Sequence, residues 1–237
     1  LGYDALYMLL QTVLVMILGA VGYNAIASGY KFAFEVPLMV AASLLLFSSL
    51  MRKSEGDLSK LILIGVIFGV LFRSTNSLLQ RMMDPLTFIN VQINYFAQFT
   101  SVNLPLLYIG MGVMLINAFW VWRIRYQLDV LLLGRNSAIE LGVHYQRTSL
   151  LILIWVAILV CVATALVGPV VFFGLLVCAM VNALAPSMKH AIRLPAVFLM
   201  AGIILVLGQT IFEQLLGMKA VLGVVVEFLG GLVFLWL

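Results

Sequence analysis

Residues 150–167 read LLILIWVAILVCVATALV, an apolar run without a charged residue that decides the fold. A helix that crosses the hydrocarbon core of a bilayer needs about 20 mostly apolar residues in succession. Outward from this run, further apolar runs occur at 5–22, 36–51, 61–79, 104–122, 170–184, 194–216 and 220–237. The sequence therefore predicts an all-α, polytopic transmembrane helical bundle, with about eight helices present.

The composition of the whole chain agrees with this prediction. Of the 237 residues, 65% are hydrophobic and only 9% are charged, and the mean hydropathy is +1.20. A soluble domain contains roughly 45–50% apolar and about 25% charged residues. The excess of apolar side chains has to face the lipid bilayer, which excludes a soluble enzyme and a nucleic-acid-binding module.

The placement of lysine and arginine predicts the orientation, because basic residues accumulate in cytoplasmic connections. The connections 52–60, 123–149 and 185–193 contain nine of the thirteen basic residues. The opposite connections contain only Lys31, Arg81 and Lys219, while Arg73 lies inside an apolar run. The first three connections are therefore predicted to be cytoplasmic.

Small residues and one Gly-Pro pair predict how the helices pack and turn. Gly65 and Gly69 form a GxxxG motif, and small residues also recur every four positions at Ala157, Cys161 and Ala165. Such spacing lets helix backbones approach closely in lipid. The run 170–184 is short and follows Gly168-Pro169, so a tight turn or a partly re-entrant segment is expected there.

Motifs that carry catalysis are missing from the sequence, which has no P-loop, HExxH, GxSxG or CxxC pair. His144 and His190 fall in predicted cytoplasmic connections, without acidic or cysteine neighbours at the spacing of a metal site. We interpret both as polar loop residues, and Cys161 and Cys178 as packing residues. No catalytic residue, metal or cofactor is expected in this chain.

Two ionisable residues lie inside apolar runs, where a charge is costly and marks a functional candidate. Arg73 precedes Ser74, Thr75 and Asn76, and Glu227 lies near the middle of the last run. One interpretation is that Arg73 and Glu227 line a polar pathway or pair with each other. The other is that Arg73 extends toward the outer interface while Glu227 makes an interhelical hydrogen bond. The residues leave both interpretations open.

The most informative stretch is residues 131–143, LLLGRNSAIELGV, within the predicted cytoplasmic connection 123–149. Its pattern predicts short amphipathic helical turns that end at Gly134 and Gly142, where glycine can reverse the chain tightly. The apolar faces of these turns would be exposed unless a partner covered them. The alternative is a loop that rests on the bilayer surface.

These motifs resemble those of a known family. Leu133-Gly134, Ala138 and Leu141-Gly142-Val143 resemble the LG…A..LGV cytoplasmic signature of the iron-chelate and cobalamin ABC importer permeases, the FecCD-type permeases of type II fold. Residues 168–177 resemble the GP.GF.GL.VP segment of that family, and residues 228–231 resemble part of its closing motif. The motifs occur in the family's order over the C-terminal half of the chain.

The resemblance implies about ten helices, of which the eight runs correspond to the third through the tenth. The chain is then expected to be one permease domain, 1–237, without the first two helices. The connection 123–149 is expected to be the coupling segment on which an ATPase subunit docks. The docking residues that the resemblance implies are Leu133, Gly134, Ser137, Ala138, Leu141, Gly142 and Val143.

The outer motifs resemble those of permeases for ferric catechol-type siderophores. Residues 84–88 and 96–99 stand where that subgroup often has DPNEF and FASFN. Glu213 departs from the family pattern. It stands near the position at which family members have an outer arginine that holds the binding protein. Lys31, Arg81 and Lys219 remain as candidates for docking that protein.

The sequence is thus predicted to encode the permease subunit of a bacterial ABC importer in the cytoplasmic membrane, which moves a ferric siderophore inward. The expected partners are two ABC ATPase subunits that bind the ATP, a second permease copy or a sister permease, and an extracytoplasmic siderophore-binding protein. The alternatives are an ABC permease for haem or cobalamin, an ion-coupled secondary transporter that uses Arg73 and Glu227, and a structural membrane subunit.

Overall fold

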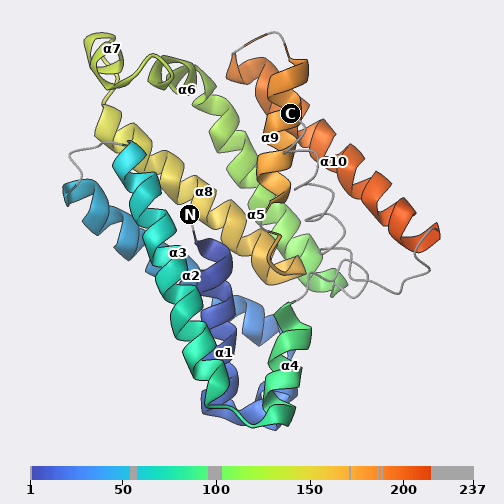
Figure 1. Ribbon diagram of the computed structural model, residues 1–237. Helices are drawn as coiled ribbons and strands as arrows, with labels where there is room; N and C mark the ends of the chain where they lie inside the picture. The colour runs from blue at the N-terminus through green and yellow to red at the C-terminus, as the bar shows by residue number, and fades with distance from the viewer. Residues whose placement is uncertain are drawn as a thin grey trace. The chain divides into compact units, whose positions relative to one another are not determined.

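The computed structural model describes residues 2–53, 58–95, 103–170, 172–185, 187 and 189–214 (Figure 1). Regular secondary structure in these residues is entirely helical. The chain divides into two compact units. The predicted run 220–237, with Glu227, and the preceding Lys219 lie outside the described residues.

The first unit contains α1 (Tyr3–Ala25), α2 (Ser28–Lys53), α3 (Leu58–Arg81), α4 (Pro85–Tyr95), most of α5 (Leu104–Arg123) and most of α8 (Tyr145–Val167). The second contains the end of α5, α6 (Arg125–Leu131), α7 (Arg135–Glu140), α9 (Phe173–Leu184) and α10 (His190–Gln214). The predicted apolar runs before residue 217 fall on α1, α2, α3, α5, α8, α9 and α10. The short helix α4 lies in the connection 80–103, and the short helices α6 and α7 lie in the connection 123–149.

Four of the described helical stretches are long and apolar enough to cross a membrane: Leu63–Arg81, Leu104–Arg123, Tyr145–Val167 and His190–Thr210. Two further apolar helices, Tyr3–Gly19 and Phe173–Leu184, are shorter. The last of these is α9, which was predicted to be short. It follows Gly168, whose φ of 104° is a conformation that glycine adopts without a Cβ clash. The prediction of an all-helical membrane fold is confirmed.

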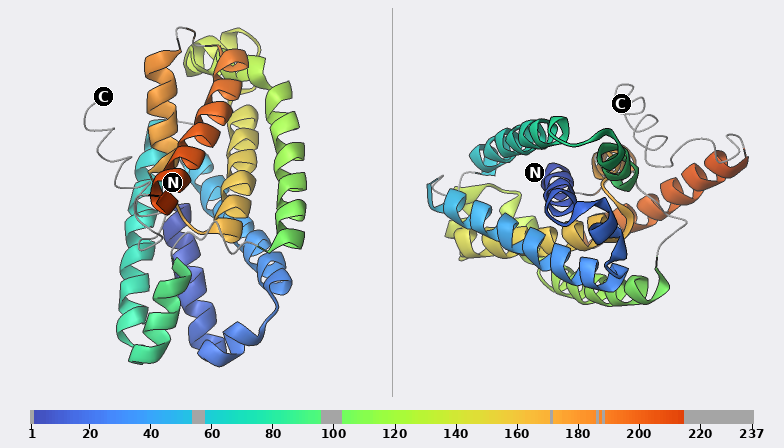
Figure 2. Two further views of the ribbon diagram at one scale, coloured as in Figure 1. Left: turned by 90° about the vertical axis from the view of Figure 1, so that its right-hand side faces the viewer. Right: turned by 90° about the horizontal axis from the view of Figure 1, so that it is seen from below.

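The centre of the first unit is α1, which α2, α3 and α4 surround (Figure 2). Small residues of α8 reach the same core, because Ala157 and Cys161 are fully buried there. The predicted role of these two residues in close packing is therefore confirmed. The core cluster consists of Tyr3, Tyr7, Leu10, Met39, Ala157 and Cys161.

The GxxxG motif of α3 lies against the start of α1. A Cβ atom on Gly2 would lie 2.9 Å from the Gly69 Cα atom and 3.3 Å from the Gly65 carbonyl oxygen. A Cβ atom on Gly69 would lie 3.3 Å from the Gly2 Cα atom. Two backbones meet here without intervening side chains, as the motif predicts.

Polar side chains in the first unit are joined across helices. The Gln11 Nε2 group of α1 donates to Glu35 Oε1 of α2 at 2.9 Å, and the Tyr23 hydroxyl donates to Gln11 Oε1. The Thr12 hydroxyl donates to Asn76 Oδ1 of α3 at 2.5 Å. Glu35 is only 3% exposed, and the sequence analysis did not single it out.

The connection 80–103 contains a helix that the sequence analysis did not predict. The Thr87 backbone N–H donates to Asp84 Oδ2 at 3.0 Å, and α4 begins at Pro85. An aspartate before a helix and a proline at its first position are both helix-start signals. The helix is held by burial of Val91 in a cluster with Val15 of α1.

Replacing Gly69 with leucine is expected to lower the free energy of unfolding by about 1–3 kcal/mol, because the new side chain would collide with the backbone of Gly2. Thermal unfolding of the purified protein in detergent measures the effect. The control is Gly202→Leu in α10, where a Cβ atom has no neighbour within 4 Å. Equal melting temperatures for the two variants would contradict the close approach of α1 and α3.

Candidate functional site

The candidate site is the coupling segment, predicted as 123–149. In the structure residues 124–144 connect α5 to α8, and residues 145–149 form the start of α8. Its residues up to Tyr145 belong to the second unit, together with α9 and α10. As predicted, it consists of short helical turns, α6 and α7, with glycines at their ends.

Arg125 fixes the direction in which the segment leaves α5. Its guanidinium carbon lies 4.6 Å from the ring centroids of both Trp122 and Tyr126. The same group donates to the Trp122 carbonyl at 3.2 Å and to the Tyr126 hydroxyl at 3.0 Å. Cation–π contacts of this kind stabilise by about 0.5–1 kcal/mol at exposed sites. In the sequence, Arg125 is recognisable only as one basic residue of a predicted cytoplasmic connection, and no local pattern reveals this contact.

The second glycine ends α7 in a Schellman motif. The Val143 backbone N–H donates to the Ala138 carbonyl at 3.0 Å, and the Gly142 N–H donates to the Ile139 carbonyl at 2.9 Å. Gly142 has φ of 81°, the left-handed conformation that this motif requires. Before the helix, Gly134 has φ of 93°. The prediction that these glycines reverse the chain is confirmed.

Several apolar side chains of the turns are exposed. Leu133 is 61% exposed and Leu141 is 60% exposed, and Leu132 and Ile139 are also exposed. Ala138, by contrast, is fully buried. Of the predicted docking residues, Leu133, Gly134, Leu141 and Gly142 are therefore accessible to a partner, Ser137 and Val143 are half-buried, and Ala138 packs inside the turn.

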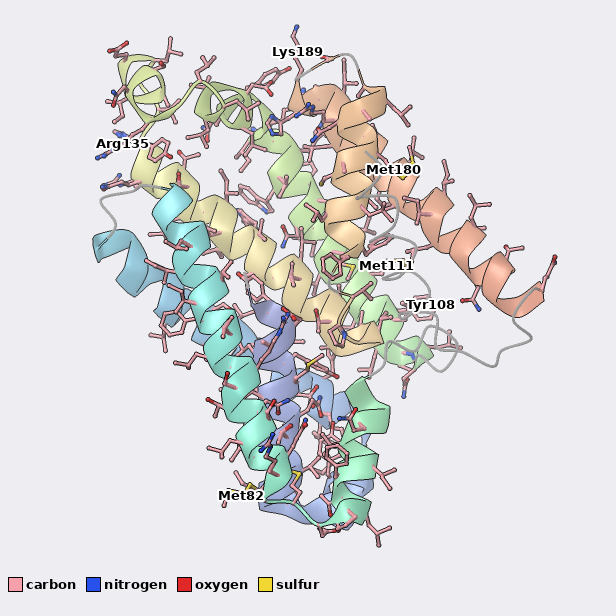
Figure 3. All side chains as sticks on the ribbon, in the orientation of Figure 1. Met82, Tyr108, Met111, Arg135, Met180 and Lys189 are labelled. Atoms are coloured by element: carbon pink, nitrogen blue, oxygen red, sulfur yellow. The ribbon has the colours of Figure 1, made fainter. Side chains whose placement is uncertain are left out.

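Basic side chains lie on the same segment and on the turn before α10. Figure 3 shows the Arg135 side chain at the start of α7 and the Lys189 side chain extending away from the ribbon. Both residues are exposed, and both connections were predicted to be cytoplasmic. Arg135 follows the exposed Leu133 by two residues in the chain.

A carboxylate of the coupling segment holds the first residue of α10. The His190 backbone N–H donates to Asp129 Oδ1 at 2.8 Å, and His190 Nδ1 lies 2.6 Å from the same oxygen. The His190 N–H, and after it the His190 ring, hold the pKa of the Asp129 carboxyl below its ordinary value. The carboxylate is therefore ionised at neutral pH.

One prediction at α10 was wrong. His190 is the first residue of the helix and pairs with Asp129, so it is not a loop residue without an acidic neighbour. The helix therefore begins before the first residue of the predicted run 194–216. No group of three or more metal-ligating side chains occurs in the described part of the chain.

Arg73, the intramembrane candidate of α3, pairs with an acidic residue of α1. Its Nη2 atom lies 2.6 Å from Asp4 Oδ2. The Arg73 side chain remains 56% exposed, because it also borders an open groove along α3. This groove has a volume of about 450 Å³ and is lined by Val70, Arg73, Ser74, Ser77, Leu78 and Arg81. Glu227, the other candidate, lies outside the described residues.

The groove brings together two residues that the sequence analysis had treated separately. Arg81 was a candidate for docking the binding protein, and here it lines the same surface as Arg73 and Ser77. Spacings of four residues place these three side chains on one face of a helix. Lys31, another docking candidate, lies elsewhere on the unit, with its Nζ atom 3.8 Å from the centre of the Tyr23 ring.

Comparison with known proteins agrees with this architecture. The chain is 38% identical over 238 residues to the petrobactin import system permease protein YclO of Bacillus subtilis (strain 168), covering 100% of this chain and 75% of that protein. It is 30% identical over 238 residues to the petrobactin import system permease protein FatC of Bacillus anthracis, covering 99% of this chain and 66% of that protein.

A solved structure, described as an inward-facing conformation of a metal-chelate type ABC transporter, has the same fold. Its TM-score is 0.80 at 20% sequence identity, and the match covers 98% of this chain and 73% of that chain. The profile of the FecCD transport family matches residues 1–237. The chain therefore belongs to the FecCD transport family, as its motifs predicted.

Proposed function

We propose that this chain is the membrane-spanning permease of an ABC importer that carries a ferric siderophore into the cytoplasm. The observation that carries the proposal is its match, over essentially its full length, to YclO and FatC, both named as petrobactin import permeases. Ferric petrobactin is accordingly the first substrate to test. In this role the chain supplies the pathway, and a partner ATPase binds and hydrolyses ATP.

The coupling segment supports an ATPase partner on its predicted cytoplasmic side. Exposed leucines on short, rigidly terminated turns provide an apolar surface that a second protein can cover. The Schellman bonds at Gly142 and the aromatic contacts of Arg125 hold that surface in one shape. A preformed surface docks without the entropy cost of ordering a loop.

The groove on α3 supports passage of an anionic chelate. Ferric siderophores bind iron through oxygen donors, many of which are anionic, and arginine and serine offer N–H and O–H donors to such oxygens. Arg73 and Arg81 stand two helical turns apart, with Ser77 between them. The remaining partners that we propose are a second permease or sister permease and an extracytoplasmic siderophore-binding protein. The expected location is the bacterial cytoplasmic membrane.

The ion-coupled alternative is less well supported. It requires Arg73 and Glu227 to act as coupling groups, whereas the Arg73 guanidinium is paired with Asp4. A purely structural subunit does not account for membership in a transport family. Haem or cobalamin as the substrate stays an alternative within the same class of importer, and only a transport measurement separates it from a siderophore.

Replacing Gly142 with tryptophan is expected to abolish copurification of the ABC ATPase and siderophore uptake. The left-handed backbone costs a non-glycine residue about 1–2 kcal/mol, and the indole would project from the docking surface. Gly142→Asn separates the two causes, because asparagine tolerates this conformation while still adding a side chain. We expect it to weaken copurification only in part.

Pull-down of the ATPase from solubilised membranes makes this measurement. The matched control is Gly29→Trp, at an exposed position of α2 where a Cβ atom has no neighbour within 4 Å. This variant should retain the ATPase like the wild type. Undiminished copurification and uptake in Gly142→Trp would show that the ATPase docks elsewhere.

Replacing Arg81 with glutamine is expected to reduce uptake of ferric petrobactin by about tenfold, because a focused positive charge raises the local concentration of an anionic ligand. The conservative variant Arg81→Lys keeps the charge and should retain most of the activity. Initial uptake rates at several substrate concentrations distinguish an effect on KM from one on the maximal rate. Equal rates for Arg81→Gln and the wild type would remove the α3 groove from the pathway.

A further inference from the structure

The contact between Asp129 and His190 joins two parts of the second unit that have different predicted tasks. Asp129 lies on α6 of the coupling segment, where the ATPase is proposed to dock. His190 begins α10, whose stretch His190–Thr210 is long and apolar enough to cross the membrane. The two residues are 61 positions apart in the chain. Figure 1 shows the start of α10 beside α6.

The geometry makes this contact strong and directional. A single carboxylate oxygen accepts from the first backbone N–H of α10 and contacts the His190 ring. Hydrogen bonds to a charged acceptor are roughly twice as strong as neutral ones. A carboxylate at a helix N-terminus is also stabilised by the helix dipole. Asp129 thus caps α10 from another helix.

The turn before α10 is braced from within as well. The Arg193 Nε group donates to the Ser187 carbonyl at 3.2 Å, and the Lys189 N–H donates to the Ser187 hydroxyl at 3.3 Å. These bonds tie the turn to the first helical residues. A displacement of Asp129 therefore acts on the first helical residue of α10 through the His190 N–H.

We propose that the Asp129–His190 contact transmits movement of the coupling segment to α10. The proposal rests on the proposed function, since it takes the coupling segment as the place where the ATPase docks. When ATPase closure shifts α6, the carboxylate draws the first turn of α10 with it. Asp129 and His190 are thus positioning residues that couple ATP hydrolysis to the rearrangement of a transmembrane helix.

The test measures siderophore uptake per ATP hydrolysed by the assembled importer in proteoliposomes. Asp129→Ala removes both bonds and is expected to lower this ratio by about five- to tenfold. Asp129→Asn keeps an oxygen that can accept from the His190 N–H, so it should recover part of the ratio. His190→Ala loses the ring and keeps the backbone bond, and an intermediate ratio is expected.

Two further variants make the assignment specific. The double variant Asp129→Ala/His190→Ala should show no lower ratio than Asp129→Ala alone, because the two residues act through one contact. Thr210→Ala, the matched control, removes the hydrogen bond from the Thr210 hydroxyl to the Val206 carbonyl within α10 and leaves the contact with α6 intact. We expect it to behave like the wild type. All variants should copurify with the ATPase in wild-type amount.

A wild-type ratio in Asp129→Ala would overturn the proposal. Loss of ATPase copurification in that variant would also overturn it, because the contact would then shape the docking surface instead of transmitting movement. If Asp129→Ala fails to accumulate in the membrane, wild-type ratios in both Asp129→Asn and His190→Ala overturn it. Failure of the proposed function is distinct, because then the wild-type protein itself neither binds an ABC ATPase nor transports ferric petrobactin.

Discussion

Lipid tails offer no hydrogen-bond partners, so each polar group inside the bilayer must find a partner within the protein. The packing of the helices depends on this constraint. In the first unit two such pairs join helices, because Arg73 pairs with Asp4 and Thr12 donates to Asn76. Within helices, the Thr75 and Thr210 hydroxyls donate to the carbonyls four residues earlier. Such pairs fix which helix faces meet, while glycine contacts such as that of Gly2 with Gly69 fix how closely they approach.

The coupling segment is built by different rules, because it lies outside the apolar runs. Its turns keep Leu133 and Leu141 exposed, and their shape depends on Gly142 and on the stacking of Arg125. A surface of this kind suits docking of a partner protein, whereas the polar pairs between the membrane helices hold those helices to one another. The Asp129 carboxylate is where these two kinds of structure meet. In the importer that we propose, this contact lies between the site of ATP hydrolysis and the transmembrane helices.

Local sequence patterns predicted much of this architecture. Apolar runs long enough to span a bilayer predicted the main helices. The LG…A..LGV motif predicted the turns at Gly134 and Gly142, and it also indicated the family. The pattern did not reveal the partners of Arg73 and His190, because Asp4 and Asp129 are 69 and 61 residues away and meet them only through tertiary packing. Helix α4 was not predicted for a different reason. Its start signals, Asp84 and Pro85, are present in the sequence, but residues 84–88 were used only for their resemblance to a family motif.

The central claim is that this chain imports a ferric siderophore with energy from an ABC ATPase. It is tested most directly by uptake of radiolabelled ferric petrobactin into bacteria from which the gene has been deleted and then restored. A ferric catecholate, a ferric hydroxamate, haem and cobalamin are measured in parallel. The account predicts that deletion selectively abolishes uptake of ferric petrobactin and that the gene restores it. If uptake of every chelate is independent of the gene, even with parallel systems deleted, the account is contradicted.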